Sequence, residues 1–188
     1  MALISTADFR TGLTIQVDGE PYQILEFQHV KPGKGSAFVR TKLKNIRTGR
    51  VLEKTFSAGE RMDPAHVEHR KVQYLYRSGD QYTFMDLETY DQFDAQPDLI
   101  TGEKYLQEGM ECEATLFEGN IIGIEVPAHV ELKVTMTDPG IRGDTATGGT
   151  KPATLETGAV VQVPLFVQVG DMVRVDTRTD TYIERVKK

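Results

Sequence analysis

The segment Tyr22–Lys44, YQILEFQHVKPGKGSAFVRTKLK, decides the fold, because it holds two extended runs joined by a turn that contains proline and two glycines. Residues 22–27 and 38–44 are typical of β-strands. Glycine permits backbone conformations that other residues rarely adopt, and proline fixes its own φ angle. The segment therefore predicts a β-hairpin with a shaped tip, at which Lys34 stands between the two glycines.

The second run of this hairpin carries apolar and basic side chains in alternation. Successive side chains of a strand point to opposite faces. One predicted face therefore holds Val39, Thr41 and Leu43, and the other holds three basic residues, Arg40, Lys42 and Lys44. This basic face would suit contact with a polyanion; a solvated charged strand face is the alternative that these residues leave open.

The rest of the chain repeats this pattern of short strands and glycine turns. Leu13–Val17 and the Asp18-Gly19 turn complete an earlier hairpin, and extended runs continue to Ile183, with room for a short helix at 102–108. Prolines and shifts in charge mark two boundaries. The sequence predicts an all-β protein built of three small β-barrels, with domains at 1–64, 65–128 and 129–188.

Charge is distributed unevenly along the 188 residues, whose net charge is −6. Residues 1–64 hold ten Lys/Arg and seven Asp/Glu, residues 65–128 hold four and thirteen, and residues 129–188 hold eight of each. Within 31–54 there are eight basic residues and a single acid, Glu53. Such a basic stretch is typical of a surface that faces a polyanion, whereas the acidic middle disfavours indiscriminate binding to nucleic acid.

Several functional classes are disfavoured. The one cysteine, Cys112, excludes an internal disulfide, and the four histidines give no convincing metal-ligand pattern. The chain has no apolar run of about twenty residues and no signal segment, so we expect a cytoplasmic protein without a membrane span, cofactor or metal. No nucleophile stands in a pattern that indicates a partner base, which argues against an enzyme.

Two further features have both a structural and a functional interpretation. Aromatic residues at strand spacing in the middle third are typical of a barrel core, although they could stack RNA bases; they are Tyr74, Tyr76, Tyr82, Phe84, Tyr90 and Phe93. Residues 143–150 have the glycine spacing of a phosphate-binding loop, but Gly149 occupies the position of its lysine, so nucleotide hydrolysis is disfavoured. This loop of small, hydroxyl-bearing residues could lie along an RNA strand; an insertion without contacts is the alternative.

Several stretches together match the pattern of one family. They are Asp8–Gly12, Lys31–Gly35, Glu53–Phe56, Gln73–Tyr76 and, most specifically, Lys151–Gly170, which carries the pattern K-x-A…G…V-P…G. Over essentially its whole length the chain resembles the bacterial translation elongation factor P family. The resemblance implies an SH3-like, KOW-type N-terminal barrel followed by two OB-fold barrels, in a bent outline similar to that of transfer RNA.

The same resemblance implies a function in translation. Members of the family bind stalled ribosomes between the peptidyl and exit sites and promote peptide-bond formation at consecutive prolines by positioning peptidyl-tRNA. The expected partners are both ribosomal subunits, peptidyl-tRNA and exit-site mRNA, and the expected state is a monomer. A general RNA-binding or ribosome-associated β module, or an elongation factor P-like paralogue, is the alternative.

The resemblance also assigns roles to residues. Lys34 would reach towards the tRNA acceptor end and be modified by a separate enzyme, with Lys31, Pro32, Gly33 and Gly35 forming its tip loop. The strand face of Arg40, Lys42 and Lys44 follows directly from this tip, and we infer that it contacts the tRNA backbone. Tyr182 and Arg185 would contact RNA, although Tyr182 could equally belong to the core. The loop facing the small subunit and mRNA would comprise Gly143, Asp144, Thr145, Gly148 and Gly149.

Overall fold

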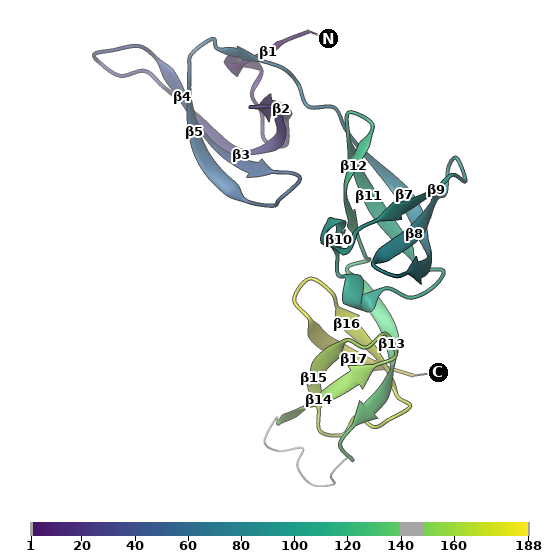
Figure 1. Ribbon diagram of the computed structural model, residues 1–188. Coiled ribbons are helices and arrows are strands. Elements are labelled where there is room, and N and C mark those ends of the chain that lie inside the picture. The colour runs from purple at the N-terminus through teal and green to yellow at the C-terminus, as the bar shows by residue number, and fades with distance from the viewer. Residues whose placement is uncertain (1, 140–148, 188) are drawn as a thin grey trace. The chain divides into compact units, whose positions relative to one another are not determined.

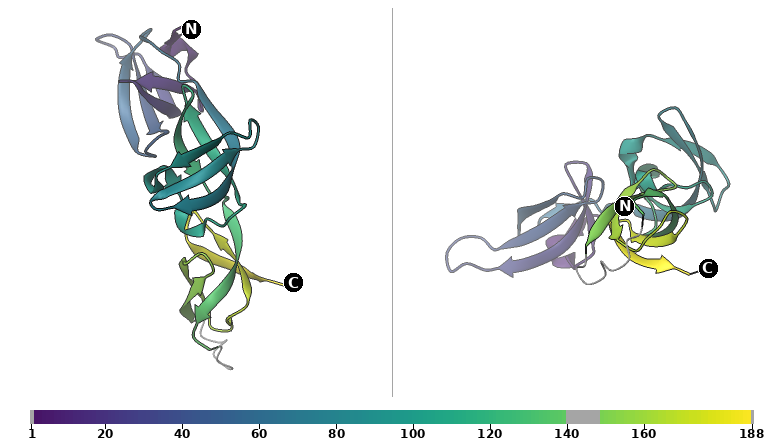
Figure 2. Two further views of the ribbon diagram at one scale, coloured as in Figure 1. Left: turned by 45° about the vertical axis from the view of Figure 1, so that its right-hand side comes forward. Right: turned by 90° about the horizontal axis from the view of Figure 1, so that it is seen from below.

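The computed structural model describes residues 2–139 and 149–187, and the regular structure within them is almost entirely β-strand (Figure 1). The strands form sheets that curl rather than lie flat, as two further views show (Figure 2). In the described ranges the helices are single 3-10 turns, none of which could cross a bilayer. The all-β prediction is confirmed.

The N-terminal sheet has the strand order β2-β3-β4-β5. Asp18 and Gly19 have φ angles of +53° and +79° and form the predicted turn between β2 and β3. A two-stranded sheet accompanies it, in which β1 pairs with β6. The bounds are β1 Ile4–Ser5, β2 Thr14–Val17, β3 Glu20–Val30, β4 Phe38–Asn45, β5 Val51–Ser57 and β6 Arg61–Met62.

One buried cluster of apolar side chains fixes which face of this sheet meets solvent. Val39 and Leu43 on β4 are fully buried, and the rings of Phe9 and Phe56 meet edge to face with centroids 5.4 Å apart. Burial of apolar area is the main stabilising term in such a small core. The cluster consists of Phe9, Ile15, Ile24, Val39, Leu43 and Phe56.

The middle sheet has the order β10-β12-β11-β7-β8-β9. The predicted helix at 102–108 is shorter than expected, because only residues 103–105 form a 3-10 turn, after which Leu106 is extended. The bounds are β7 Val67–Ser78, β8 Gln81–Asp86, β9 Gln92–Ala95, η2 Pro97–Leu99, β10 Ile100–Thr101, η3 Glu103–Tyr105, β11 Glu111–Phe117 and β12 Asn120–Glu125.

The aromatic residues of this sheet divide into core and surface. Tyr74, Tyr82 and Phe84 are buried, and Phe93 is half-buried and stacks on Phe84, as the core interpretation predicts. For Tyr76 and Tyr90 that prediction is wrong, because 49% and 70% of these residues are exposed. The pairing of β7 with β8 shifts between Tyr74 and Tyr76, and Tyr90 lies outside the strands with φ of +63°.

The C-terminal sheet has the order β15-β14-β13-β16-β17. Its core strands alternate strictly, so that Val130, Leu132 and Val134 are buried while the residues between them are exposed. The bounds are β13 His129–Thr137, β14 Thr150–Leu155, β15 Val160–Pro164, β16 Met172–Asp176 and β17 Thr181–Val186.

The chain divides into two compact units, Met1–His69 with Thr115–Gly123 and Arg70–Ala114 with Ile124–Lys188. In the second unit, the fully buried Tyr105 of η3 donates a hydrogen bond from its hydroxyl to Asp180 Oδ1 at 2.6 Å. Lys104 Nζ lies 3.1 Å from the same oxygen. These contacts join the middle and C-terminal sheets, because Asp180 precedes β17.

Candidate nucleic-acid interface

The predicted tip joins β3 to β4 and extends beyond the strands (Figure 1). Val30 and Phe38 form the last cross-strand pair, and residues 31–37 belong to no strand. Lys34 is exposed in this turn, and its side chain has no hydrogen bond or ion pair with any residue in 2–139 or 149–187. A free ammonium on a flexible stem can bind a phosphate or be extended covalently.

Only one of the two tip glycines meets a backbone requirement. Gly35 has a φ angle of +98°, which residues with a side chain rarely adopt, whereas the φ angle of Gly33 lies outside this positive region. A Cβ added at Gly33 would meet no heavy atom within 4 Å. Gly35 rather than Gly33 therefore sets the shape of the turn. Lys31 is exposed and Pro32 is half-buried.

The basic face of β4 is present as predicted. Arg40, Lys42 and Lys44 are exposed, and the residues between them are buried. The Arg40 guanidinium carbon lies 5.8 Å from the centre of the Phe38 ring, two residues nearer the tip. A guanidinium beside an aromatic ring offers both a charge and a surface for stacking. This end of β4 therefore suits contact with a nucleotide.

The neighbours of the three basic residues differ in charge. Arg40 pairs in register with Gln28 and Thr55, and Lys44 pairs with Gln23 and Val51; these neighbours are all neutral. Lys42 pairs with two acids, Glu26 on β3 and Glu53 on β5. Lys42 and both glutamates also line a shallow hollow of about 330 Å³ on this face. The basic character is therefore concentrated at the two ends of the row.

Tyr182 and Arg185 lie on β17, where a register shift places them opposite Val175 and Val173. Tyr182 is half-buried, and this burial raises the pKa of its hydroxyl. Arg185 lies 3.6 Å from Asp171, and its guanidinium carbon is 5.1 Å from the centre of the Phe166 ring. Arg185 thus contacts residues of the segment between β15 and β16, Tyr182 is partly buried, and the contact of both with RNA stays a prediction.

Four residues of the predicted mRNA-facing loop, Gly143, Asp144, Thr145 and Gly148, lie outside the described residues. Gly149 directly precedes β14 and is half-buried. Two residues further along the chain, the buried Lys151 donates a hydrogen bond from Nζ to the backbone carbonyl of Asp138. Lys151 therefore links β14 to the segment that follows β13.

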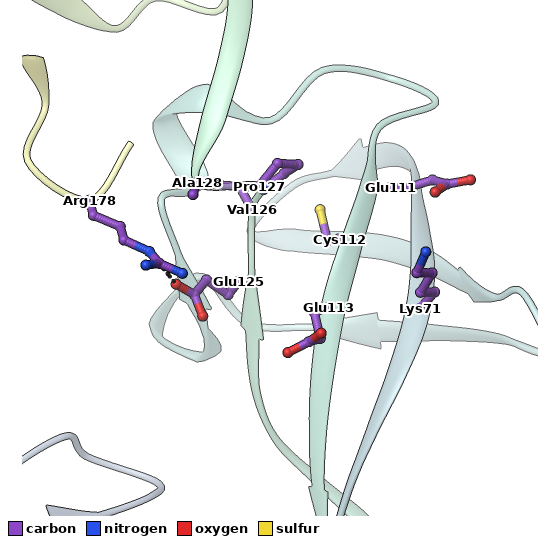
Figure 3. A pocket seen from close by; sticks show the side chains of 9 residues that line it. All are labelled: Lys71, Glu111, Cys112, Glu113, Glu125, Val126, Pro127, Ala128 and Arg178. Carbon is purple, nitrogen blue, oxygen red and sulfur yellow. Dashed lines mark ion pairs between the residues drawn. The ribbon is translucent and has the colours of Figure 1, made fainter. Parts of the chain in front are cut away.

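A second hollow, of about 340 Å³, contains Cys112 (Figure 3). Burial raises the pKa of the Cys112 thiol to about 12, so the thiol is protonated at neutral pH and is a poor nucleophile. Figure 3 also shows Arg178 turned towards Glu125, with Arg178 Nε 3.6 Å from Glu125 Oε1. In the described parts of the chain no three His, Cys, Asp or Glu side chains are grouped to hold a metal ion.

Three family models together match most of the chain. The elongation factor P KOW-like domain matches residues 5–62, its OB domain matches 67–124, and its C-terminal domain matches 130–185. The chain belongs to the elongation factor P family. The elongation factors P of Pelotomaculum thermopropionicum and Moorella thermoacetica are each 62% identical to it over 98% and 97% of this chain and 100% of their own length. That of Synechococcus sp. is 58% identical over 97% of this chain.

Two solved structures share part of the fold. Translation initiation factor 5A from Methanococcus jannaschii matches 65% of this chain and 93% of its own, with a TM-score of 0.53 and 25% identity. A factor 5A family protein from Naegleria fowleri matches 66% of this chain and 98% of its own, with a TM-score of 0.54 and 19% identity. The predicted family, and the predicted KOW-like and OB folds, are confirmed.

Sequence reasoning missed two features of the site. The acid Glu26 precedes the basic segment 31–54 in the sequence, and only the register of β3 with β4 brings it opposite Lys42. Lys151 entered as part of a family pattern, but its burial and its bond to Asp138 could not be read from that pattern. A lysine in strict alternation with apolar residues was the available signal for its burial.

Proposed function

We propose that this protein is a translation elongation factor that binds stalled ribosomes between the peptidyl and exit sites and promotes peptide-bond formation at consecutive prolines. The observation that supports this most strongly is 62% identity to proteins named elongation factor P over their full length. The exposed Lys34 at the end of a long hairpin agrees with a group that must reach a distant target.

Positioning is the step that the factor would supply. Proline is a hindered secondary amine with a locked φ angle, so a peptide that ends in two prolines can sit badly for reaction. Fixing the reactants near their reactive geometry lowers the barrier without a new chemical group. Lys34 would hold the acceptor end of peptidyl-tRNA, while the ribosome carries out the chemistry.

The remaining parts of the interface follow from this arrangement. The basic face of β4 would contact the tRNA backbone next to the tip, Tyr182 and Arg185 would contact RNA from the C-terminal sheet, and the 143–149 loop would approach the small subunit and exit-site mRNA. The protein would act in the cytoplasm as a monomer and would not be an enzyme. The protonated thiol of Cys112 agrees with that absence of covalent chemistry.

A purified translation system tests the proposal. The rate of bond formation should rise when the protein is added to ribosomes that translate Pro-Pro, and should not change on a matched Phe-Phe template. Equal effects on the two templates would instead favour a general ribosome-associated module. No effect on either template would contradict the proposed function.

Modification of Lys34 is tested separately. Peptide mass spectrometry of the protein isolated from its native cells should find added mass on Lys34 and none on Lys31, the exposed lysine of the same turn. An unmodified Lys34 would remove the modifying enzyme from the proposal and leave the positioning role intact.

A further inference from the structure

The basic face of β4 does not carry three equivalent cations. Cross-strand neighbours in an antiparallel sheet lie about 5 Å apart, so Glu26 and Glu53 place a negative charge on either side of Lys42. One lysine between two carboxylates has a net charge of −1, whereas Arg40 and Lys44 each stand between neutral side chains. Along the strand the local charge therefore runs +1, −1, +1.

This pattern has a consequence for the ligand. Arg40 and Lys44 are four residues apart, which separates their Cα atoms by about 13 Å along the strand. A polyanion laid along β4 would meet the two carboxylates between these contacts, and like charges at short range repel. A folded RNA whose backbone approaches both ends of the strand would avoid them.

We propose that Lys42 serves to offset Glu26 and Glu53, and that Arg40 and Lys44 alone bind phosphates of the tRNA backbone. This inference rests on the proposed function, because it refines how the β4 face holds its RNA. The glutamates make the face selective: they limit it to two phosphate contacts and disfavour a polyanion that follows the strand.

Salt dependence separates phosphate contacts from compensating charges. Each phosphate neutralised by a cation releases counterions, and its loss lowers the slope of log K against log salt by roughly 0.7 to 0.9. All five side chains are exposed, so their replacement by glutamine should leave the fold intact. Far-ultraviolet circular dichroism and thermal melting would verify this for every variant.

The experiment measures binding to ribosomes that carry peptidyl-tRNA, over a series of potassium chloride concentrations. Arg40→Gln and Lys44→Gln should each lower the slope by the amount expected for one phosphate contact, roughly 0.7 to 0.9. The neutral triple variant Glu26→Gln/Lys42→Gln/Glu53→Gln should keep the slope of the wild type, since it removes no contact. The double variant Glu26→Gln/Glu53→Gln should bind several-fold more tightly with a steeper slope, because Lys42 becomes available.

Two outcomes would overturn the inference. If the triple variant loses as much slope as Arg40→Gln, Lys42 binds a phosphate itself; the β4 face then still contacts RNA as proposed. If none of the variants changes the slope, Arg40 and Lys44 make no phosphate contacts, and the assignment of this face to RNA fails as well. The Pro-Pro rate assay decides the proposed function independently of both results.

Discussion

In each of two sheets of this molecule, a basic residue on one strand lies between glutamates on the two neighbouring strands. The two rows differ in whether the basic side chain forms ion pairs with these glutamates. In the C-terminal sheet, Arg174 on β16 pairs in register with Glu131 and Glu184. Arg174 Nη2 lies 2.8 Å from Glu131 Oε1, and Nη1 bonds Glu184. In the N-terminal sheet, Lys42 stands between Glu26 and Glu53, and within residues 2–139 and 149–187 it forms no ion pair within 4.0 Å.

The difference follows from the shape of the two cations. A guanidinium has two separate ends that can each bond a carboxylate, whereas an ammonium is a compact, strongly hydrated point charge. Both carboxylates raise the pKa of Arg174, and the largest cause is the hydrogen bond that Arg174 donates to Glu131. We therefore expect that removing a paired charge lowers the stability of the fold. Removing an unpaired charge of the β4 face should instead weaken binding.

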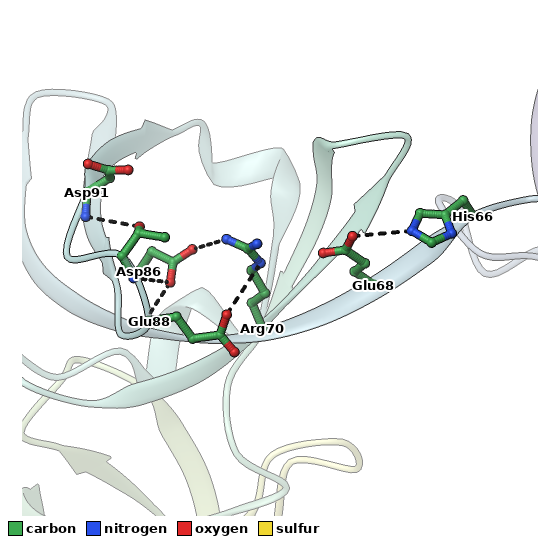
Figure 4. A network of polar contacts seen from close by, with 7 residues as sticks. His66, Glu68, Arg70, Asp86, Glu88 and Asp91 are labelled. Atoms are coloured by element: carbon green, nitrogen blue, oxygen red, sulfur yellow. Dashed lines mark hydrogen bonds and ion pairs between the residues drawn. The ribbon is translucent and has the colours of Figure 1, made fainter.

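Asp86 tests whether a paired charge stabilises the fold. Asp86 is buried and accepts hydrogen bonds from Arg70 Nη1 at 2.8 Å and from the backbone N–H of Glu88 (Figure 4). It also accepts one from the backbone N–H of Thr89. Asp86→Ala removes one acceptor of Arg70 and the acceptor of the two backbone N–H groups, and it should lower the free energy of unfolding by about 2 kcal/mol. Denaturant unfolding measures this loss.

Asp86→Asn is the matched control, because its amide oxygen can still accept from the two backbone donors, whereas the charge and the acceptor for Arg70 are lost. It should cost less than the alanine variant. A loss below about 0.5 kcal/mol for Asp86→Ala would contradict the structural role of this pair, since that is the range of ordinary surface substitutions.

Acid should weaken the same contact. The hydrogen bond from Arg70 holds the pKa of Asp86 below its usual range. A carboxyl group whose pKa is lowered by folding contributes stability that is present above the unfolded pKa, near 4, and is lost as the pH falls through the folded pKa. Unfolding measured from neutral pH to below about pH 4 should therefore show a smaller acid loss for Asp86→Asn than for the wild type. Equal losses would contradict this.

The contact between the middle and C-terminal sheets should give a smaller effect. Tyr105→Phe removes the hydroxyl that bonds Asp180 and should lower the free energy of unfolding by about 1 kcal/mol, because Asp180 is half exposed and water replaces part of the bond. The exposed Tyr76 provides a control, and Tyr76→Phe should be neutral. Equal unfolding curves for the two variants would show that the hydroxyl contributes nothing.

Exchanging lysine and arginine between the two rows should give the smallest change in stability. Arg174→Lys should lower the melting temperature by a few degrees at most, because a point charge cannot bond both glutamates fully. Lys42→Arg should not lower the melting temperature, since the guanidinium of the new arginine can reach both Glu26 and Glu53. Identical melting of the Arg174→Lys protein and the wild type would mean that the two rows do not differ in stability.

The sequence could predict which residues of β4 are exposed, but not which residues of the neighbouring strands lie beside them. The exposure of Arg40, Lys42 and Lys44 follows from the alternation of a single strand, which is a local property. The neighbour of Lys42 depends on an irregularity between Ile24 and Glu26 that shifts the pairing of β3 with β4. Without it, Leu25 would stand opposite Lys42. Register between strands depends on tertiary packing, so the sequence could not place Glu26.

The other differences have similar causes. A single 3-10 turn replaces the predicted helix at 102–108, because Gly102 with φ of +84° and the extended Leu106 bound it on both sides. Tyr76 leaves the predicted core at a shift in the pairing of β7 with β8. The tip turn was predictable because Gly35 and the adjacent strands determine it locally.

The central claim is that Lys34 is a positioning group with no structural role. The most direct test is the rate of Pro-Pro bond formation on ribosomes saturated with Lys34→Ala protein, with Lys31→Ala as the matched variant of the same turn. Saturation removes any difference in binding, and thermal melting confirms the fold. We predict that Lys34→Ala loses the acceleration, by a factor on the order of ten or more, while Lys31→Ala keeps it. Full acceleration by saturating Lys34→Ala protein would contradict the claim.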